Sequence, residues 1–555
     1  MEDGTGPPSA VTPGTDHDAA IARTGMALVC LALLSRVLGL ARDMATAWLL
    51  GAGPVADALT AALRIPHMAR RFLGDGSLAM PLTAAMVRTA HPQGPCAVPA
   101  PDAPEPFRCT FAGLALRCLV VLLCLVLAGE FAAPWIIHCL APGFAVSVAD
   151  LAASLLRICL PYVAMAGMAA MCMAYLNSRN RFLLPALSPT LFNIAMLAAL
   201  ALAWHSVPAG GDSAVPGVAM WVAAGMACSG IVQLLWQWSG VGRPSGILLV
   251  APEGGRRFAA SMTRGIVSAC SAQLAMLAAM AVASFQEGVA CLYYAERLIE
   301  LPLGLAGVCL ATAGLPTLSR LAVREEFPAF AGVLATSLRW SLFYSLPACI
   351  GLLAVSPTLI PLLLKHGAFN DAAVRGTILA VFGYLPGLPA FALNRCLMAA
   401  CHATGGFRAA ARSAGWTVVA TVAAGIALSW CLPPMLRTMA PSLGASVGLW
   451  LQFLLLRHAV IRALPSTLDV GLLSPGTIVC AGIAAVATGT AAWAAVILCG
   501  GLGDGPVTAI AFVAGLGACL GCLALGAPRD MRLLLDGIGR RGAAGDRTEG
   551  DSEQI

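Results

Sequence analysis

Long apolar runs, interrupted by short stretches that contain glycine, proline or charged residues, follow one another along the chain. A membrane-spanning helix needs about 20 mainly apolar residues, whereas the strands of a membrane barrel alternate over about 10 residues. Runs such as 114–127 and 477–498 are continuously apolar, which favours helices over a barrel. The pattern predicts an all-α polytopic membrane protein with about fourteen transmembrane helices, expected at roughly 25–50, 54–90 (interrupted), 109–137, 148–175, 183–205, 216–238, 260–285, 289–318, 336–363, 373–400, 408–432, 441–463, 475–500 and 505–526.

Composition supports this class. Hydrophobic residues make up 59% of the 555 residues and charged residues only 11%, whereas ordinary soluble domains carry about 25% charged residues. These values exclude soluble, disordered and small disulfide-stapled proteins. The 20 cysteines are scattered through apolar runs, and the eight histidines have no metal-ligand spacing, so neither a disulfide framework nor a metal site is expected.

The distribution of basic residues predicts the orientation of the chain in the membrane. Residues 1–22 are polar and lack the basic region of a signal peptide, so the first apolar run is expected to be a retained span. With a cytoplasmic N-terminus, the inside loops and the tail collect almost all loop arginines, and only Lys365, Arg375 and Arg437 fall outside. Cytoplasmic loops carry the excess of basic residues, so both termini are predicted to be cytoplasmic.

Two proline-marked spans indicate an internal repeat. In the second and eighth spans, 236 residues separate Pro66 from Pro302, and 235 residues separate Pro81 from Pro316. Matching spans lie six apart and run in the same direction, which predicts two parallel six-helix lobes, as in many transporters; a chance coincidence is the alternative. The resulting domain prediction is a polar cytoplasmic extension at 1–22, lobes at 23–240 and 241–463, two extra C-terminal helices at 464–527, and a polar cytoplasmic tail at 528–555.

Charged residues gather inside three of the predicted spans. A charge at the centre of a bilayer helix costs about 2.5–3.5 kcal/mol on insertion scales, so such residues usually face a cavity and carry function. Glu296 and Glu300 lie four apart and Arg297 and Glu300 three apart, so each pair shares a helix face. The three spans contain Arg36, Arg42 and Asp43; then Asp57, Arg64, Arg70, Arg71 and Asp75; and then Glu296, Arg297 and Glu300.

These charges have two interpretations that the sequence leaves open. Arginines and acids can pair with each other to hold the helices together, or extend to the membrane surface. Alternatively, arginines from both lobes that meet in one cavity would bind a phosphate-bearing substrate through bidentate hydrogen bonds. The acids could then couple transport to an ion or a proton. Arg117, Arg157 and Arg395 are further cavity candidates, and His67 is more often a structural residue.

Glycine and proline residues accompany the charges in the first two spans. Discontinuous helices at membrane depth are tolerated where they line protein or a cavity. We therefore expect helix breaks or hinges at Gly39, Gly51, Gly53, Pro66, Gly74 and Gly76.

At these residues the chain resembles the MurJ/MviN family of lipid II flippases, within the multidrug/oligosaccharidyl-lipid/polysaccharide exporter superfamily. The stretches that carry the resemblance are SRVLGLARDMATAWLLGAGPVADA (35–58), LRIPHMARRFLGDGSLAMPL (63–82), AAPWIIHCLAPGF (132–144), LLRICLPYV with LNSRNRFLLPALSPTLFNI (155–194), YYAERLIELPLGLAGVCLATAGLPTLS (293–319) and, more sparsely, HGAFN (366–370).

The resemblance implies two six-helix lobes around a cationic cavity, with two C-terminal helices that form a groove for a polyprenyl tail. It also implies translocation of an undecaprenyl-diphosphate-linked disaccharide-pentapeptide from the inner to the outer leaflet by alternating access, in a bacterial inner membrane. By motif, the family's cavity arginines fall on Arg36, Arg42, Arg70 and Arg297, its important acids on Asp57 and Glu300, and a further cavity cation on Arg395, with Asp43 and Glu296 as neighbouring acids.

The leading hypothesis is therefore a lipid flippase and not an enzyme. Its partners would be the polyprenyl-diphosphate glycopeptide lipid, the bilayer and the cell-wall synthesis machinery, with no nucleic acid. The chain has no phosphate-binding Gly-x-x-x-x-Gly-Lys-Ser/Thr loop and no cofactor is expected, so a coupling ion or the membrane potential would drive transport. The alternatives are a flippase for another polyprenyl-diphosphate glycan, a small-molecule antiporter of the same superfamily, a membrane glycosyltransferase, and a structural scaffold.

Overall fold

The computed structural model divides the chain into two compact units, and each is described separately here. Unit 1 comprises Met1–Cys139 and Phe144–Ala269, and unit 2 comprises Leu140–Gly143 and Cys270–Ile555. The structure describes residues 15–74, 105–179, 181–206, 215–242, 273–465, 475–499 and 503–526. The boundary predicted between lobes at residue 240 lies beside the range 243–272, which is outside the described residues, so the domain limits stay a prediction.

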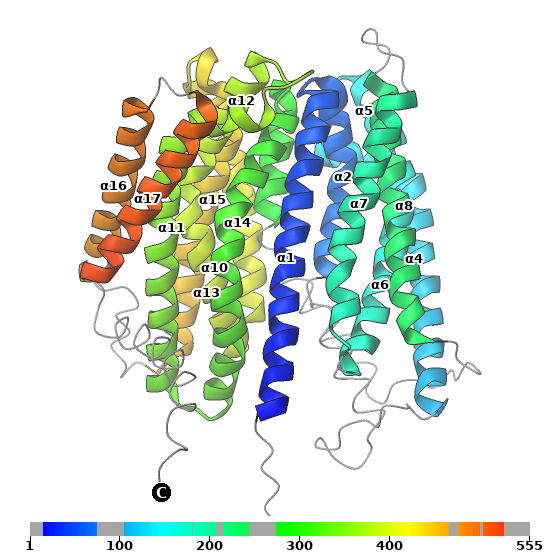
Figure 1. The fold of residues 1–555 in the computed structure, drawn as a ribbon, viewed down its shortest axis with the longest axis horizontal. Helices are drawn as coiled ribbons and strands as arrows, with labels where there is room; N and C mark the ends of the chain where they lie inside the picture. Colours follow the sequence, from blue (N-terminus) through cyan, green and yellow to red (C-terminus); the bar gives the residue numbers. More distant parts are fainter. Residues whose placement is uncertain are drawn as a thin grey trace, which may run out of the picture. The chain divides into compact units, whose positions relative to one another are not determined.

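Unit 1 is built from seven described helices (Figure 1). The chain turns between the first two at Gly51, whose φ of +64° is a left-handed conformation that glycine adopts without a steric cost. A second boundary falls at Pro161, which begins a helix because its missing N–H is not needed at that position. The helices are α1 (Thr15–Leu50), α2 (Pro54–Gly74), α4 (Glu105–Leu140), α5 (Val146–Cys159), α6 (Pro161–Ser178), α7 (Leu183–Ser206) and α8 (Val215–Val241).

Unit 2 contains the remaining helices. It begins with a short apolar helix over Gln273–Gln286, which ends in the 3₁₀ turn η1 (Ser284–Gln286). The elements that follow are α10 (Val289–Val323), α11 (Phe327–Leu364), α12 (Asp371–Tyr384), η2 (Leu385–Gly387), α13 (Leu388–Ala403), α14 (Phe407–Cys431), η3 (Pro434–Met439), α15 (Ala440–Ala463), α16 (Pro475–Leu498) and α17 (Asp504–Gly526).

The predicted all-α membrane architecture is confirmed. Among the described residues, eleven segments are long and apolar enough to cross a membrane, and each of the fourteen predicted spans contains a helix. Helix α2 is not among the eleven because its 21 residues carry four charges. The spans expected at 148–175 and 373–400 are each divided, the first between α5 and α6 and the second by η2.

Two side chains of α15 donate hydrogen bonds to the backbone at the break formed by η2. Three backbone carbonyls at the break accept hydrogen bonds from α15: Ser446 Oγ donates to Gly383 O at 2.6 Å and to Tyr384 O at 3.3 Å, and Trp450 Nε1 donates to Pro386 O at 2.8 Å. Backbone polar groups inside a membrane must find protein partners, because no water is available there. The break is therefore bonded to α15.

Helices α14 and α15 of unit 2 cross at glycine residues. A Cβ atom built on Gly444 would lie 2.7 Å from the backbone of Gly425, and one built on Gly448 would lie 2.8 Å from Thr417 O. Small residues allow two membrane helices to approach this closely and gain van der Waals contact. Any side chain at these two positions would push the helices apart.

Two of the predicted helix breaks are wrong. Helix α1 continues through Gly39, and α2 continues through Pro66. Gly39 instead lies beside α7, where an added Cβ would be 3.6 Å from Asn193 Nδ2, so its small size serves packing. The chain does turn at Gly51 and Gly53, between α1 and α2.

Candidate functional site

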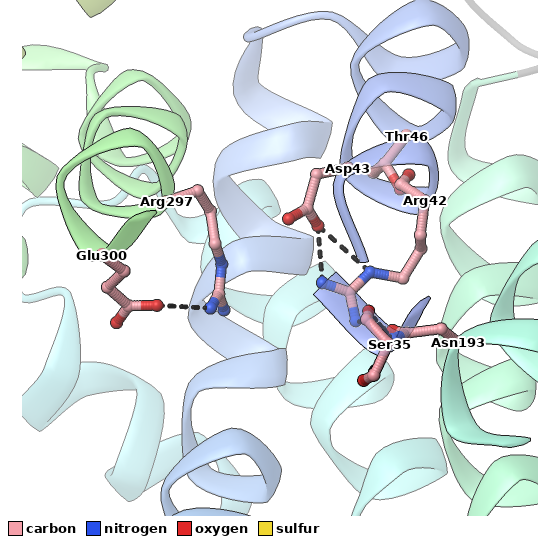
Figure 2. Close-up of polar contacts among 7 residues, drawn as sticks. All are labelled: Ser35, Arg42, Asp43, Thr46, Asn193, Arg297 and Glu300. Atoms are coloured by element: carbon pink, nitrogen blue, oxygen red, sulfur yellow. Dashed lines mark hydrogen bonds and ion pairs between the residues drawn. The ribbon is translucent and has the colours of Figure 1, made fainter. Parts of the chain in front are cut away.

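The candidate site in unit 1 contains a buried ion pair on α1 (Figure 2). Arg42 donates from Nε and Nη2 to Asp43 Oδ1, at 3.1 and 2.7 Å. The side chains are only 6% and 10% exposed. Two charges removed from water are stable only when they are paired and hydrogen-bonded, which is the case here.

Asn193 on α7 links this ion pair to the backbone of α1. Its Oδ1 accepts from Arg42 Nη1 at 3.1 Å, and its Nδ2 donates to Ser35 O at 2.8 Å (Figure 2). One amide side chain thereby fixes both the Arg42 guanidinium and the spacing between the two helices. Three Arg42 nitrogens are hydrogen-bonded in this arrangement.

Phe192, the neighbour of Asn193, brings together side chains from three other helices. The Cζ atom of Arg70 on α2 lies 4.6 Å from the centre of its ring, and the Cζ atom of Arg42 lies 5.5 Å from it. His67 and Tyr162 approach the same ring edge-on, with centroid distances of 6.4 and 5.9 Å. Phe192 has no exposed surface. This ring is therefore the centre of the polar interior of unit 1.

Three polar or charged side chains of α2 are also enclosed in protein. Asp57, Arg64 and His67 are 2%, 8% and 7% exposed, although charged residues are rarely this buried unless they have partners. Arg70 is half-buried. Asp57, Arg64 and His67 thus lie within the protein rather than at its surface, whereas the side chain of Arg71 and the whole of Asp75 are outside the described residues.

A second pair lies on α10 of unit 2. Arg297 Nη1 donates to Glu300 Oε2 at 3.0 Å (Figure 2). The Arg297 Cζ lies 4.7 Å from the centre of the Tyr293 ring. The prediction that Arg297 and Glu300 share a helix face is confirmed. Glu296, on the same helix, instead accepts a hydrogen bond of 3.0 Å from the buried hydroxyl of Tyr384 on α12.

The remaining candidate arginines are less enclosed. Arg36 is half-buried on α1, and Arg395 on α13 is exposed within unit 2. Arg117 and Arg157 are exposed, and Arg157 Nε donates to the backbone oxygen of Glu130 at 3.2 Å.

The described part of the second span ends at Gly74. Gly74 is the last residue of α2. Gly76 and Asp75 lie outside the described residues, and so does any hinge at Gly76.

Five residues of the site were not predicted from the sequence. Phe192, Tyr162, Tyr293 and Tyr384 resemble ordinary apolar or interfacial side chains, and only Asn193 had a signal, as an amide inside an apolar span. The two arginine clusters share one chemical feature: a guanidinium that is stacked on an aromatic ring and paired with a carboxylate. Such groups bind phosphate or carboxylate ligands strongly in a water-poor site.

Comparison with known sequences gives a consistent result. The family profile described as "Lipid II flippase MurJ" matches residues 46–502. The probable lipid II flippase MurJ of Rhizobium meliloti (strain 1021) is 32% identical over 435 residues, which cover 76% of this chain and 77% of that protein. The corresponding protein of Vibrio cholerae is 29% identical over 390 residues, or 68% of this chain and 71% of that one.

Solved structures share the fold. The lipid II flippase MurJ in an inward closed conformation superposes with a TM-score of 0.68 at 20% identity, and covers 90% of this chain and 98% of that one. An inward-facing multidrug resistance MATE family transporter superposes with a TM-score of 0.59 at 14% identity, over 79% of this chain and 97% of that one. The fold is thus common to transporters of different cargo.

Proposed function

The chain belongs to the lipid II flippase MurJ family, and from this premise we propose that it carries lipid II from the inner to the outer leaflet of the cytoplasmic membrane by alternating access. It is a multi-pass inner-membrane transporter rather than an enzyme, and its cargo is a lipid-linked molecule.

The buried arginines of unit 1 carry the proposal. A diphosphate is an anion that hydrocarbon excludes, because an unpaired charge loses its hydration without compensation. Arg42 is buried on α1, and Arg70 is half-buried on α2. Both guanidinium groups lie near the ring of Phe192, inside the protein. They would replace water as hydrogen-bond donors to the diphosphate while its head group crosses the membrane.

Unit 2 has its own set of side chains that could bind an anionic head group. Arg297 lies stacked on Tyr293 and paired with Glu300. The Arg297–Glu300 pair carries no net charge before cargo arrives, which limits the cost of a buried charge. Arg36 and Arg395 would extend the cationic surface in each unit. Glu300 and Asp57 are the proposed coupling acids, because each is a carboxylate in a charged, enclosed part of a span.

The polyprenyl tail would stay in lipid beside α16 and α17. These two helices form a hairpin that packs on α11 through Val355, Ala492 and Ala511. Large apolar side chains remain exposed on both, such as Ile483 and Phe512, and they suit contact with an isoprenoid chain. Transport would be driven by a coupling ion or by the membrane potential. Both termini would be cytoplasmic, and the cell-wall synthesis machinery would be a partner.

Complementation tests the proposal directly. Cells whose own lipid II flippase is depleted receive the wild-type gene or a single Arg36→Ala, Arg70→Ala or Arg297→Ala variant, and lipid II accessibility at the outer surface is scored. The wild type should restore access, and the variants should lose it. Arg324→Ala is the matched control, because Arg324 is 68% exposed and its contact with Glu326 is 3.9 Å long. Membrane levels of each variant are measured in parallel.

Two outcomes would overturn parts of the proposal. Rescue by the wild type and equally by all three variants would refute the arginine-based cargo site. No rescue by a well-inserted wild type would favour another polyprenyl-diphosphate glycan, or an antiporter that shares the fold. The multidrug reading rests on the fold alone, and fold does not specify cargo.

A further inference from the structure

Phe192 occupies an unusual position for a phenylalanine in a membrane helix. Its ring has no exposed surface, yet the groups around it are two guanidinium groups, an imidazole and a phenol, from Arg42, Arg70, His67 and Tyr162. An apolar ring in a membrane protein normally packs against aliphatic side chains or lipid. The surroundings indicate a role other than filling space.

The ring of Phe192 attracts two arginine cations that would otherwise repel each other. The Cζ atoms of Arg42 and Arg70 lie 5.5 and 4.6 Å from its centre, so they are at most 10.1 Å apart, the sum of these distances. At such a separation in a water-poor interior the two cations repel each other. The negative face of an aromatic ring attracts a cation within about 6 Å, and both cations meet this limit.

The contact also differs chemically from a salt bridge. A carboxylate that holds an arginine occupies its N–H groups, as Asp43 does with Arg42 at 2.7 and 3.1 Å. An aromatic face attracts the guanidinium through the negative charge of its ring face, so this contact needs no hydrogen-bond acceptor. A phenylalanine is therefore a suitable support for an arginine that has to bind phosphate.

Asn193 continues the same function on α7. It accepts from Arg42 Nη1 and donates to Ser35 O, which fixes Arg42 relative to α1. Phe192 then contacts both this fixed arginine and Arg70 on α2. The consecutive residues Phe192 and Asn193 thus connect the charged part of α1 with the charged part of α2.

We propose that Phe192 is a positioning residue for the cargo diphosphate: its ring fixes the location of the Arg70 guanidinium beside the Arg42–Asp43 pair. This inference rests on the proposed function and adds a residue to it. It assigns Phe192 an electrostatic task, which depends on the electron density of the ring. A packing role would depend only on the shape of the ring.

Stepwise fluorination of this ring separates the two roles. Phe192 is replaced by mono-, di- and trifluorophenylalanine in the full-length protein, and binding of undecaprenyl diphosphate is measured in detergent. Fluorine withdraws electron density from the ring face and changes its volume little. A desolvated cation–π contact is worth up to about 2 kcal/mol, so affinity should fall stepwise, by about 5- to 30-fold across the series. Phe192→Tyr should retain binding.

Phe111 provides the matched control within unit 1. It is 3% exposed and packs on Tyr175 with a centroid distance of 4.8 Å, in an apolar cluster. Fluorination of Phe111 should leave affinity unchanged. A flat affinity series at Phe192, with a wild type that binds and flips lipid II, would overturn the inference alone. A wild type that neither binds undecaprenyl diphosphate nor rescues depleted cells would overturn the proposed function.

Discussion

Replacement of Asp43 by asparagine tests how much the buried ion pair contributes to stability. The change keeps the size of the side chain and removes its charge. In the native protein Asp43 accepts two hydrogen bonds from Arg42, and both side chains are at least nine-tenths buried. Asp43→Asn would leave the Arg42 guanidinium as an uncompensated charge in the interior of unit 1.

The structure ranks this effect against two other ion pairs. Loss of one partner of a buried pair costs about 3–5 kcal/mol, and we expect the lower end, about 3 kcal/mol, because polar groups of an unfolded membrane protein also find partners. The Arg297–Glu300 side chains are 19% and 27% exposed and share one bond of 3.0 Å, so Glu300→Gln should cost about 1 kcal/mol. Glu326→Gln, in the exposed 3.9 Å pair, should change stability by less than about 0.5 kcal/mol.

Thermal unfolding of the purified protein in detergent would measure this ranking. Each of the three variants is compared with the wild type at one protein concentration and one detergent concentration. A second measurement uses the double variant Arg42→Met with Asp43→Asn, which removes both charges. The double variant should be more stable than Asp43→Asn alone, because no uncompensated charge remains.

An Asp43→Asn protein that is no less stable than Glu326→Gln would contradict the expected cost of an unpaired Arg42. A double variant less stable than Asp43→Asn alone would also contradict it, since the penalty would then arise from lost packing and not from an unpaired charge. Either result would mean that other groups around Arg42 compensate its charge.

Three further predictions concern other parts of the chain. Gly444→Ala should lower the unfolding temperature, at a cost of about 1–3 kcal/mol, because the new Cβ would lie 2.7 Å from backbone. Gly332→Ala, with open space around it, should not lower it, and equal unfolding temperatures would contradict the close helix crossing. Alkaline phosphatase fused after Gly367 should be active and green fluorescent protein fused after Gly405 should fluoresce, and the reverse pattern would invert the orientation. Tyr384→Phe removes a 3.0 Å hydrogen bond to a buried carboxylate on α10 and should destabilise the protein by about 1–3 kcal/mol in the same unfolding assay; an unchanged unfolding temperature would show that the bond contributes nothing.

Hydropathy predicted the helices because the membrane sets their length and composition. It did not predict that the spans at 148–175 and 373–400 are divided, although Pro161 and Pro386 mark both places. The opposite error occurred at Gly39, where a glycine within a long helix provides room for a neighbouring side chain. A glycine or proline alone does not tell whether the chain bends or packs, since that depends on the adjacent helix.

The polar contacts of the site were predictable only where one helix determines them. Arg297 and Glu300 lie three residues apart, and helix geometry alone brings them together. Asn193 bonds to Arg42 across 151 residues of sequence, and this contact follows only from the packing of α7 on α1. The stacking of Arg42 and Arg70 on Phe192 has the same origin, so the sequence could name the arginines but not the ring that supports them.

The bonded break at η2 has a mechanical consequence for unit 2. Any bending between α12 and α13 would separate Gly383 O and Pro386 O from their donors on α15, and no water would replace these donors. Helices α12, α13 and α15 must therefore move together as one rigid body, although η2 interrupts the helix between α12 and α13. Motions that change access in this unit would then take place where this three-helix body meets the neighbouring helices.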